Sequence, residues 1–442
     1  MANLLRARSV DEEKAEAQPG AHRFLSPLLL GLSILFLLVN ALALYLAQPS
    51  GDSGIWWMLL VWAACAVIGG ALLRRSLPNS DPFFFPISMF LSGWGILAIE
   101  RVAPNFAQRQ IVWLVVAVIV LVVTASFPRL IVLLRNYRYT LLFAGIAVLV
   151  ITILFGSNPS GIAGAPALWL NLGDFFIQPS EPLKIILVVF LSSYLAEQYS
   201  VVRVENAAFG RAPSPRMFGP VLLMWGVSVI VLVWQRDLGT AALFFLVFLT
   251  LLYVASGQIR LLLAGGILAL VAGAAAYVLF GVVRLRVDAW INPWPEADNR
   301  AYQIVQSLMA VANGGVMGQG IGQGSPTYIP VVHSDFIFAA LAEEWGLIGV
   351  VAVLFCFALI ITRSLRSTVS LRPFPALLGV GLSALLAIQT ILIIGGVLKV
   401  VPLTGVTVPF MSYGGSSLVT NFLLIGLMLR LSAGEQALAL SA

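Results

Sequence analysis

Long apolar stretches separated by short polar connections dominate the pattern along this chain. A helix needs about 20 apolar residues to cross the hydrocarbon core of a bilayer. The pattern predicts twelve spanning helices, at residues 27–47, 55–73, 83–99, 111–127, 139–155, 182–196, 217–234, 238–255, 261–283, 336–362, 375–398 and 410–431. The predicted fold class is therefore an all-α polytopic membrane protein, and the even number of spans places both termini on one side.

Composition supports the same fold class. The 442 residues are 60% hydrophobic and 10% charged, whereas soluble domains average about 45–50% apolar and about 25% charged. The two cysteines, Cys65 and Cys356, lie inside apolar runs and predict neither a disulfide nor a metal cluster. Nucleic-acid binding is not expected despite the net charge of +6, because the basic residues have another explanation.

That explanation is membrane orientation. With the N-terminus inside, seventeen of the 25 Lys and Arg residues fall in predicted cytoplasmic segments, as the positive-inside rule requires. The predicted cytoplasmic loops are short, whereas the outside carries segments 156–181 and 284–335. The second of these predicts an amphipathic helix over 300–313, capped by Asp298 or Asn299 and lying on the outer membrane surface. Its predicted apolar stripe is Ile304, Val305, Leu308, Met309 and Ala312.

Charged residues at membrane depth are costly and indicate function by default. Glu181 and Lys184 are three residues apart on one face at the start of a short span. An internal ion pair that lets this helix sit in lipid is the alternative. Asp237 occupies a tight turn at the outer mouth of the bundle, and a helix-capping carboxylate paired with Arg236 is the alternative there.

Asp335 is predicted at the outward-facing N-terminus of a span, where a plain N-cap is the competing interpretation. Glu343 lies on the same side of that helix, within about 80°, and Glu344 points the other way. These two acids predict a hydrated cavity, or ion pairs with Lys184 or Lys399.

Other signals are weaker. The glycine-rich run 318–324 follows no strand, so nucleotide binding is not expected. Arg284 and Arg286 open the long external segment, where interfacial anchoring is the simpler interpretation. Ser412 begins a run that interrupts the last span, and irregular backbone at that depth must line a cavity or be buried. One histidine outside the N-terminal tail with scattered acids predicts no zinc site.

Together these motifs resemble the SEDS family (shape, elongation, division and sporulation), which includes RodA, FtsW and SpoVE, with the RodA-like branch favoured. The matching pieces, in family order, are Trp169-Leu-Asn171-Leu-Gly173, Gln178-Pro-Ser-Glu181-Pro-Leu-Lys184, Gln235-Arg-Asp237-Leu-Gly-Thr240, Tyr302-Gln-Ile-Val-Gln-Ser307, His333-Ser-Asp335-Phe-Ile-Phe338, Ala342-Glu-Glu344-Trp-Gly346, Pro402-Leu-Thr-Gly405 and Ser412-Tyr-Gly-Gly-Ser416.

The resemblance implies a ten-helix core at 83–431, with the large external loop 284–335. Residues 27–82 then hold two extra N-terminal spans, and 1–26 and 432–442 are cytoplasmic tails. It also implies an enzyme of the bacterial cytoplasmic (inner) membrane that polymerises lipid II into glycan strands on the outer face. The expected partner is a class B penicillin-binding protein, in cell elongation and shape or in division.

By the same resemblance, Asp335 is the catalytic residue. The implied substrate-binding residues are Glu181, Lys184, Arg109, Asp237, Arg286, Trp169 and Ser412. In the implied reaction the acceptor's 4-hydroxyl attacks the donor's anomeric carbon and undecaprenyl pyrophosphate leaves. This needs a base, for which Asp335 is the candidate, and cations for the diphosphate, for which Lys184, Arg109 and Arg286 are candidates. A divalent cation, Mg²⁺ or Mn²⁺, is a possible cofactor, and no metal ligand is assigned.

Three other functions use the same features. A lipid II flippase should carry polar residues through the full membrane depth, whereas the charges here stop near the outer third, apart from Glu343 and Glu344. A non-catalytic membrane partner of a penicillin-binding protein needs no acidic cavity. An ion-coupled transporter needs acids at the midplane on broken helices, and here only these two glutamates and the break at Ser412 suggest one.

Overall fold

The structure is a computed structural model that describes residues 19–47, 54–158, 167–173, 175–207 and 237–434, with isolated positions between 219 and 230. Its first half contains the helices α2 (Pro19–Ala47), α3 (Ile55–Ser76), α4 (Phe84–Val102), α5 (Pro104–Ser126), α6 (Leu130–Asn136), α7 (Arg138–Phe155) and α8 (Ser180–Ala207). A two-stranded antiparallel hairpin, β1 (Leu170–Leu172) and β2 (Phe175–Ile177), precedes α8.

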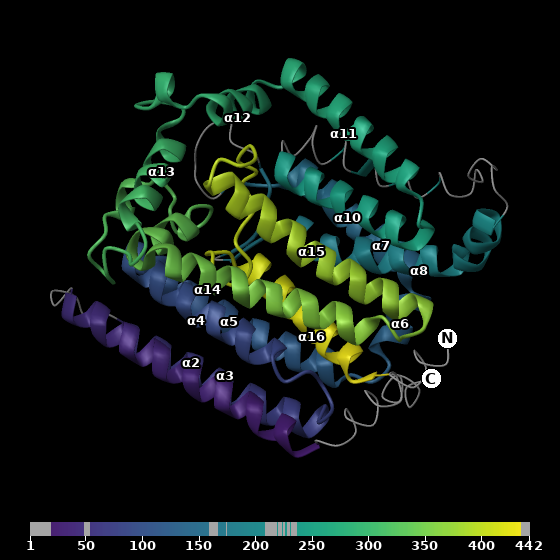
Figure 1. Ribbon diagram of the computed structural model, residues 1–442, viewed down its shortest axis with the longest axis horizontal. Helices are drawn as coiled ribbons and strands as arrows, with labels where there is room; N and C mark the ends of the chain where they lie inside the picture. The colour runs from purple at the N-terminus through teal and green to yellow at the C-terminus, as the bar shows by residue number, and fades with distance from the viewer. Residues whose placement is uncertain are drawn as a thin grey trace, which may run out of the picture.

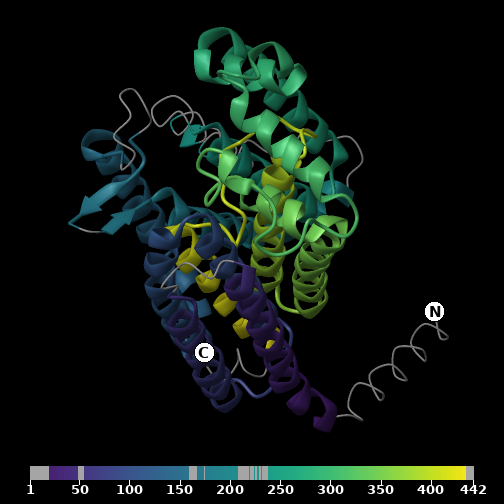
Figure 2. The ribbon, with the colours of Figure 1, turned by 90° about the vertical axis from the view of Figure 1, so that its left-hand side faces the viewer.

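The second half contains α10 (Leu238–Ser256), α11 (Ile259–Leu279), α12 (Gly281–Ile291), α13 (Tyr302–Gly314), α14 (Ile337–Thr368), α15 (Pro373–Val397) and α16 (Gly415–Ser432). Helices α4, α5, α14, α15 and α16 run side by side through the centre of the bundle, and α2 and α3 cover one edge (Figure 1). The hairpin stands out at one side of the molecule (Figure 2).

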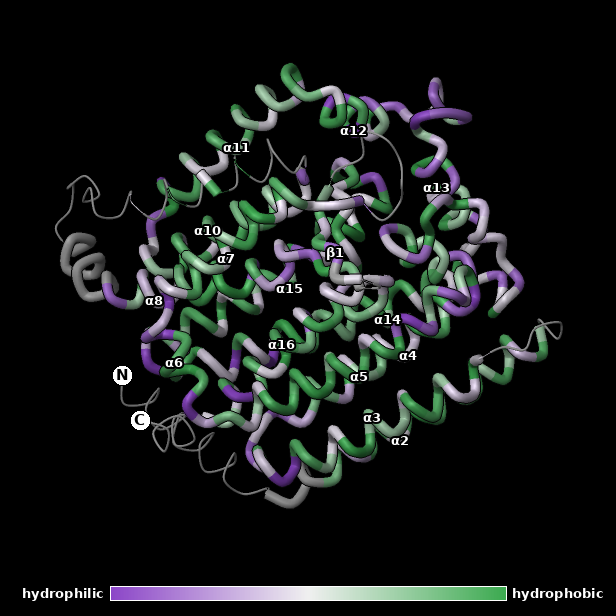
Figure 3. Tube along the Cα trace, turned by 180° about the vertical axis from the view of Figure 1, so that it is seen from behind, coloured by the Kyte–Doolittle hydropathy of each residue, from purple (hydrophilic) through white to green (hydrophobic). Residues whose placement is uncertain are grey.

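Within the described residues, ten helices are long and apolar enough to span a membrane, and each overlaps a predicted span. Apolar residues cover most of their length, while polar residues gather around α13 and at the turns (Figure 3). Helix α8 overlaps the predicted span 182–196 but carries five charged residues, Glu181, Lys184, Glu197, Arg203 and Glu205. The predicted span 217–234 lies largely outside the described residues, so the count of twelve stays a prediction. The all-α membrane fold is confirmed.

The bundle has one end that gathers the predicted cytoplasmic segments. There Arg363 Nε lies 2.6 Å from Asp81 Oδ2, and the Asp81 amide donates to Ser432 Oγ at 3.0 Å. At the same end Ser126 Oγ donates to Ser76 Oγ at 2.9 Å. Asp335, which is predicted to be external, lies at the other end, just before the start of α14. Which end faces the cytoplasm stays a prediction.

Helices α2 and α3 are tightly attached to the remaining bundle. The indole of Trp62 on α3 is fully buried and donates to the Met89 carbonyl of α4 at 3.1 Å. A β carbon on Gly93 of α4 would collide with Leu37 of α2 and with Trp62. The glycine therefore permits the close approach of both helices.

Helix α14 is broken near its N-terminal end at Gly346, whose φ is 62° and ψ is −161°. The break leaves the Glu343 and Glu344 carbonyls free to accept from the amides of Gln319 and Gly320, at 2.9 and 3.0 Å. The glycine-rich run folds back onto α14 here, and its Gly318, with φ 82°, has no room for a side chain against Glu344. Close packing against the α14 backbone therefore explains the glycine at position 318.

The predicted external helix is α13, but its predicted capping is wrong. Ala301 is the N-cap, and its methyl side chain cannot accept a hydrogen bond. Asp298 and Asn299 lie before it, where Glu296 O accepts from the amides of Asn299 and Ala301, both at 3.0 Å. The helix buries Ile304, Val305, Ser307 and Ala310, whereas Met309 of the predicted stripe is exposed. It packs on α14, so its buried face is turned toward protein.

Candidate active site

The connection between α15 and α16, residues 398–414, is contacted by residues of α10, α12 and α15. Its Thr404 carbonyl accepts from Arg286 Nη1 of α12 at 3.2 Å, and its Thr407 carbonyl accepts from Gln389 Nε2 of α15 at 3.0 Å. A β carbon on Gly239, in the first turn of α10, would lie 2.5 Å from Thr404 O. This connection therefore brings together segments that are far apart in the sequence.

Asp335 lies beside this connection. Its Oδ1 accepts from Ser334 Oγ at 2.8 Å. A β carbon on Gly405 would lie 3.5 Å from Arg286 Nη2 and 3.7 Å from Asp335 Oδ2. Burial raises the pKa of the Asp335 carboxyl, the Ser334 hydrogen bond and the Arg286 charge oppose this shift, and the Asp237 charge adds to it.

The alternative role of Asp335 as an N-cap is wrong. Helix α14 begins at Ile337, its N-cap is Phe336, and no side chain caps it. The Asp335 carboxylate is therefore not used to satisfy helix amides, which leaves it free for chemistry.

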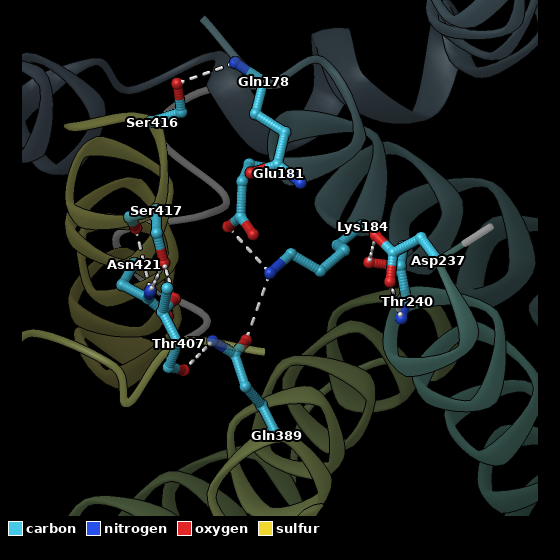
Figure 4. A network of polar contacts seen from close by, with 10 residues as sticks. All are labelled: Gln178, Glu181, Lys184, Asp237, Thr240, Gln389, Thr407, Ser416, Ser417 and Asn421. Carbon is cyan, nitrogen blue, oxygen red and sulfur yellow. Dashed lines mark hydrogen bonds and ion pairs between the residues drawn. The ribbon is translucent and has the colours of Figure 1, made fainter. Parts of the chain in front are cut away.

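Glu181 and Lys184 form an ion pair of 2.7 Å in the first turns of α8. Lys184 Nζ also donates to Gln389 Oε1 at 3.2 Å, and Gln389 links onward to Thr407 (Figure 4). Glu181 is 6% and Lys184 3% exposed. An ammonium has three donors, and these two partners, from the described part of the chain, use two of them.

Asp237 caps α10. Its Oδ1 accepts from the Thr240 amide at 2.9 Å and its Oδ2 from Thr240 Oγ1 at 2.6 Å (Figure 4). The capping interpretation is therefore confirmed, while Arg236, its expected ion-pair partner, lies outside the described residues. The cap does not exclude a role at the site, because the Asp237 charge acts on the pKa of Asp335.

Arg109 is exposed near the N-terminal end of α5, beside Tyr413. Burial raises the pKa of the Tyr413 hydroxyl, and Arg109 partly opposes this shift. Ser412 is 4% exposed, and its Oγ donates to Ser334 O at 2.6 Å. Trp169 pairs through its backbone with Ser157 next to the hairpin, and none of the described contacts joins it to the group around Asp335.

The predicted pairing of Glu343 or Glu344 with Lys184 or Lys399 is wrong. Glu344 lies 3.3 Å from Arg101 of α4. Glu343 Oε1 instead accepts from the Ser325 amide at 3.2 Å. The reason is the break at Gly346, which brings the glycine-rich run against both glutamates.

No three His, Cys, Asp or Glu side chains gather into a possible metal site in the described part of the chain. These residues therefore offer no preformed cage for Mg²⁺ or Mn²⁺, which prefer several oxygen ligands. Sequence reasoning missed Gln110, Gln389 and Thr407, because an uncharged polar residue costs less in a membrane span than a charged one and therefore stands out less in the sequence.

Comparison with known proteins identifies the family. The family model of the FtsW/RodA/SpoVE cell cycle proteins matches residues 83–437. The chain belongs to this family. Among FtsW/RodA/SpoVE proteins, the peptidoglycan glycosyltransferase RodA of Mycobacterium tuberculosis is 36% identical over 412 residues, covering 89% of this chain and 87% of the relative. A Geobacter sulfurreducens protein named "Probable peptidoglycan glycosyltransferase FtsW" is 32% identical over 301 residues, covering 67% of this chain and 78% of the relative.

Solved structures of the family share the fold. A structure described as "Structural coordination of polymerization and crosslinking by a peptidoglycan synthase complex" matches with a TM-score of 0.60 and 25% identity, over 85% of this chain and 97% of that one. The RodA crystal structure from Thermus thermophilus matches with a TM-score of 0.57 and 24% sequence identity. The match covers 80% of this chain and 96% of that one, and it supports the fold alone.

Proposed function

We propose that this integral membrane protein is a peptidoglycan glycosyltransferase that polymerises lipid II, with Asp335 as the general base. The observation that carries the proposal is the placement of a carboxylate without a capping role beside Arg286, across Gly405. The relatives named as peptidoglycan glycosyltransferases support the reaction class. We place the site on the outer face of the bacterial cytoplasmic membrane, as the distribution of basic residues predicts.

The chemistry follows from these positions. Asp335 removes the proton from the acceptor's 4-hydroxyl as the hydroxyl oxygen bonds to the donor's anomeric carbon. The bond between that carbon and the diphosphate oxygen breaks, and undecaprenyl pyrophosphate leaves as the anion. Arg286, Lys184 and Arg109 stabilise the diphosphate, and a guanidinium suits it because two parallel N–H groups match two phosphate oxygens.

The partner in this proposal is a class B penicillin-binding protein, which would crosslink the strands that this enzyme makes. The fold match to a structure from a peptidoglycan synthase complex supports such an assembly. Ser412 is proposed to support the site without touching the substrate, because its hydroxyl is hydrogen-bonded to backbone groups of the protein. Trp169 and Glu181 stay predicted substrate-site residues.

The test uses purified full-length protein, with and without its cognate penicillin-binding protein, and labelled lipid II. Wild type should form glycan polymer, and Asp335→Asn should lose it by at least about 10²-fold, because an amide cannot take the proton. The melting temperature should stay near wild type, since Asp335 caps no helix. Asp298→Asn, an exposed acid on the same external segment, is the matched control and should keep full activity.

Two results would contradict the proposal. Long glycan strands from a folded Asp335→Asn protein would move the base elsewhere, with Asp237 the next candidate. Wild type that makes no polymer but carries lipid II across vesicle bilayers would be a flippase.

A further inference from the structure

Gln110 is an uncharged residue that contacts the site from inside α5. Its side chain is 1% exposed although it lies in a membrane-spanning helix, and a buried amide needs hydrogen-bond partners. Its Nε2 donates to Ser412 O at 3.1 Å, and its Oε1 accepts from the Gly414 amide at 3.2 Å. Both partners are backbone groups of the connection between α15 and α16. The amide therefore fixes this connection with a donor and an acceptor at once.

The same connection holds the backbone next to Asp335. Ser412 Oγ accepts from the Val408 amide at 2.9 Å and donates to Ser334 O at 2.6 Å. Ser334 in turn donates through its own Oγ to Asp335. A continuous series of hydrogen bonds thus leads from Gln110 through Ser412 and Ser334 to the carboxylate.

A second contact from α5 acts on the same segment. Phe106, one helical turn before Gln110 and on the same face, stacks on the His333 ring with centroids 4.3 Å apart and planes at 14°. The Tyr413 amide donates to His333 O at 2.8 Å. Residues 333 and 334 are thus held by α5 directly and through 412–414.

The connection has little room to move. A β carbon on Gly95 of α4 would lie 2.5 Å from the Met411 backbone, and one on Gly415 would collide with Trp113 of α5. Residues 411–415 are packed between α4 and α5. Because packed interiors transmit displacements, a shift of α5 against this connection would move its neighbours as well.

We propose that Gln110 is a positioning residue that sets the place of the Asp335 carboxylate through Ser412 and Ser334. The inference rests on the proposed function, in which Asp335 is the base. A base must lie within hydrogen-bond reach of the proton that it removes, and a displacement of about 1 Å can lower the rate about 10²-fold. Gln110 itself needs no contact with lipid II.

The test compares Gln110→Met with Asn40→Leu in the full-length protein with its penicillin-binding protein. Met keeps the length of the side chain and removes both hydrogen bonds. Asn40 is a buried amide of α2, and among the described residues its side chain bonds within its own helix, to Phe36 O at 2.7 Å. Asn40→Leu therefore controls for the loss of a buried polar group. We expect Gln110→Met to lower kcat at least about tenfold with KM for lipid II within about twofold, and Asn40→Leu to change neither.

Ser412→Ala breaks the same series one step nearer to Asp335 and provides the test if Gln110→Met does not fold. It should lower kcat to a similar extent. The double variant should be no slower than the slower single variant, since residues in one network are not additive. Independent, multiplying losses would contradict a shared path.

The outcomes separate the two proposals. If Asp335→Asn is inactive while Gln110→Met and Ser412→Ala keep the kcat of Asn40→Leu, the positioning role is overturned and the base remains. If Asp335→Asn keeps its activity, the proposed base is overturned, and the positioning role with it.

Discussion

Arg286 and Asp335 face each other across Gly405. A β carbon on this glycine would lie 3.5 Å from the guanidinium of Arg286 and 3.7 Å from the carboxylate of Asp335. Arg286 is fixed in this place by its bond to Thr404 O. The pairing puts a cation for the leaving diphosphate next to the base, and it favours the charged form of the carboxyl against burial.

Filling the space at Gly405 should separate the two. Gly405 has φ of 74°, so Gly405→Val adds backbone strain of about 1–2 kcal/mol as well as bulk. Gly257→Val is the matched control, because Gly257 has φ of 68° and nothing within 4 Å of an added β carbon. Both should lower the melting temperature, but only Gly405→Val should lower polymerisation, by at least about tenfold. Equal activity of the two would show that the space at Gly405 is not part of the site.

The pH dependence of polymerisation should report Asp335. Burial raises the pKa of its carboxyl, and the base is active only when deprotonated, so activity should fall as the pH falls through this raised pKa. Arg286→Met removes a charge that lowers this pKa, so the acidic limb of kcat should move to higher pH. Asp237→Asn removes a charge that raises it and should move the limb to lower pH, with the helix cap retained because Asn caps well.

Arg284→Met is the control for the pH measurement. Arg284 lies on the same helix, but its side chain donates to the carbonyls of Tyr277 and Val278. Removing the Arg284 charge should leave the acidic limb of kcat at the same pH. Shifts of the same sign in Arg286→Met and Asp237→Asn would contradict the assignment.

The Lys184–Glu181 pair can be tested by removing one charge and then both. Lys184→Met leaves a buried carboxylate without its cation, which should cost about 3–5 kcal/mol of stability. Adding Glu181→Gln should restore most of the melting temperature but not the KM for lipid II, since the ammonium for the diphosphate is still absent. If the double variant recovered both the melting temperature and the KM for lipid II, the pair would have only a structural role. The same two changes at Arg138 and Glu197, a pair at the opposite end of the bundle, should leave KM unchanged.

Topology can be tested by cysteine labelling in a background with Cys65→Ala and Cys356→Ala. Asp298 and Arg366 are both exposed and lie in segments predicted on opposite sides. Asp298→Cys should react with an impermeant maleimide in intact cells, and Arg366→Cys only after permeabilisation. The reverse pattern would invert the proposed orientation and place Asp335 inside.

The sequence predicted the membrane class and the family motifs, and both are confirmed by the helices and by the family match to 83–437. It could do so because the length of an apolar stretch and the cost of a charge in lipid are local properties. The same local cost singled out Glu181, Lys184, Asp237 and Asp335.

Only the tertiary structure decided which groups meet. Gln110 and Ser412 are 302 positions apart, and neither amide nor backbone carbonyl carries a sequence signal for its partner. The pairing of Glu344 with Arg101 instead of a lysine depends on how α14 breaks and how the glycine-rich run folds onto it. Hydrophobic burial is non-directional and can be read from composition. Hydrogen bonds and ion pairs depend on distances of a few ångströms, which are set only when distant helices pack.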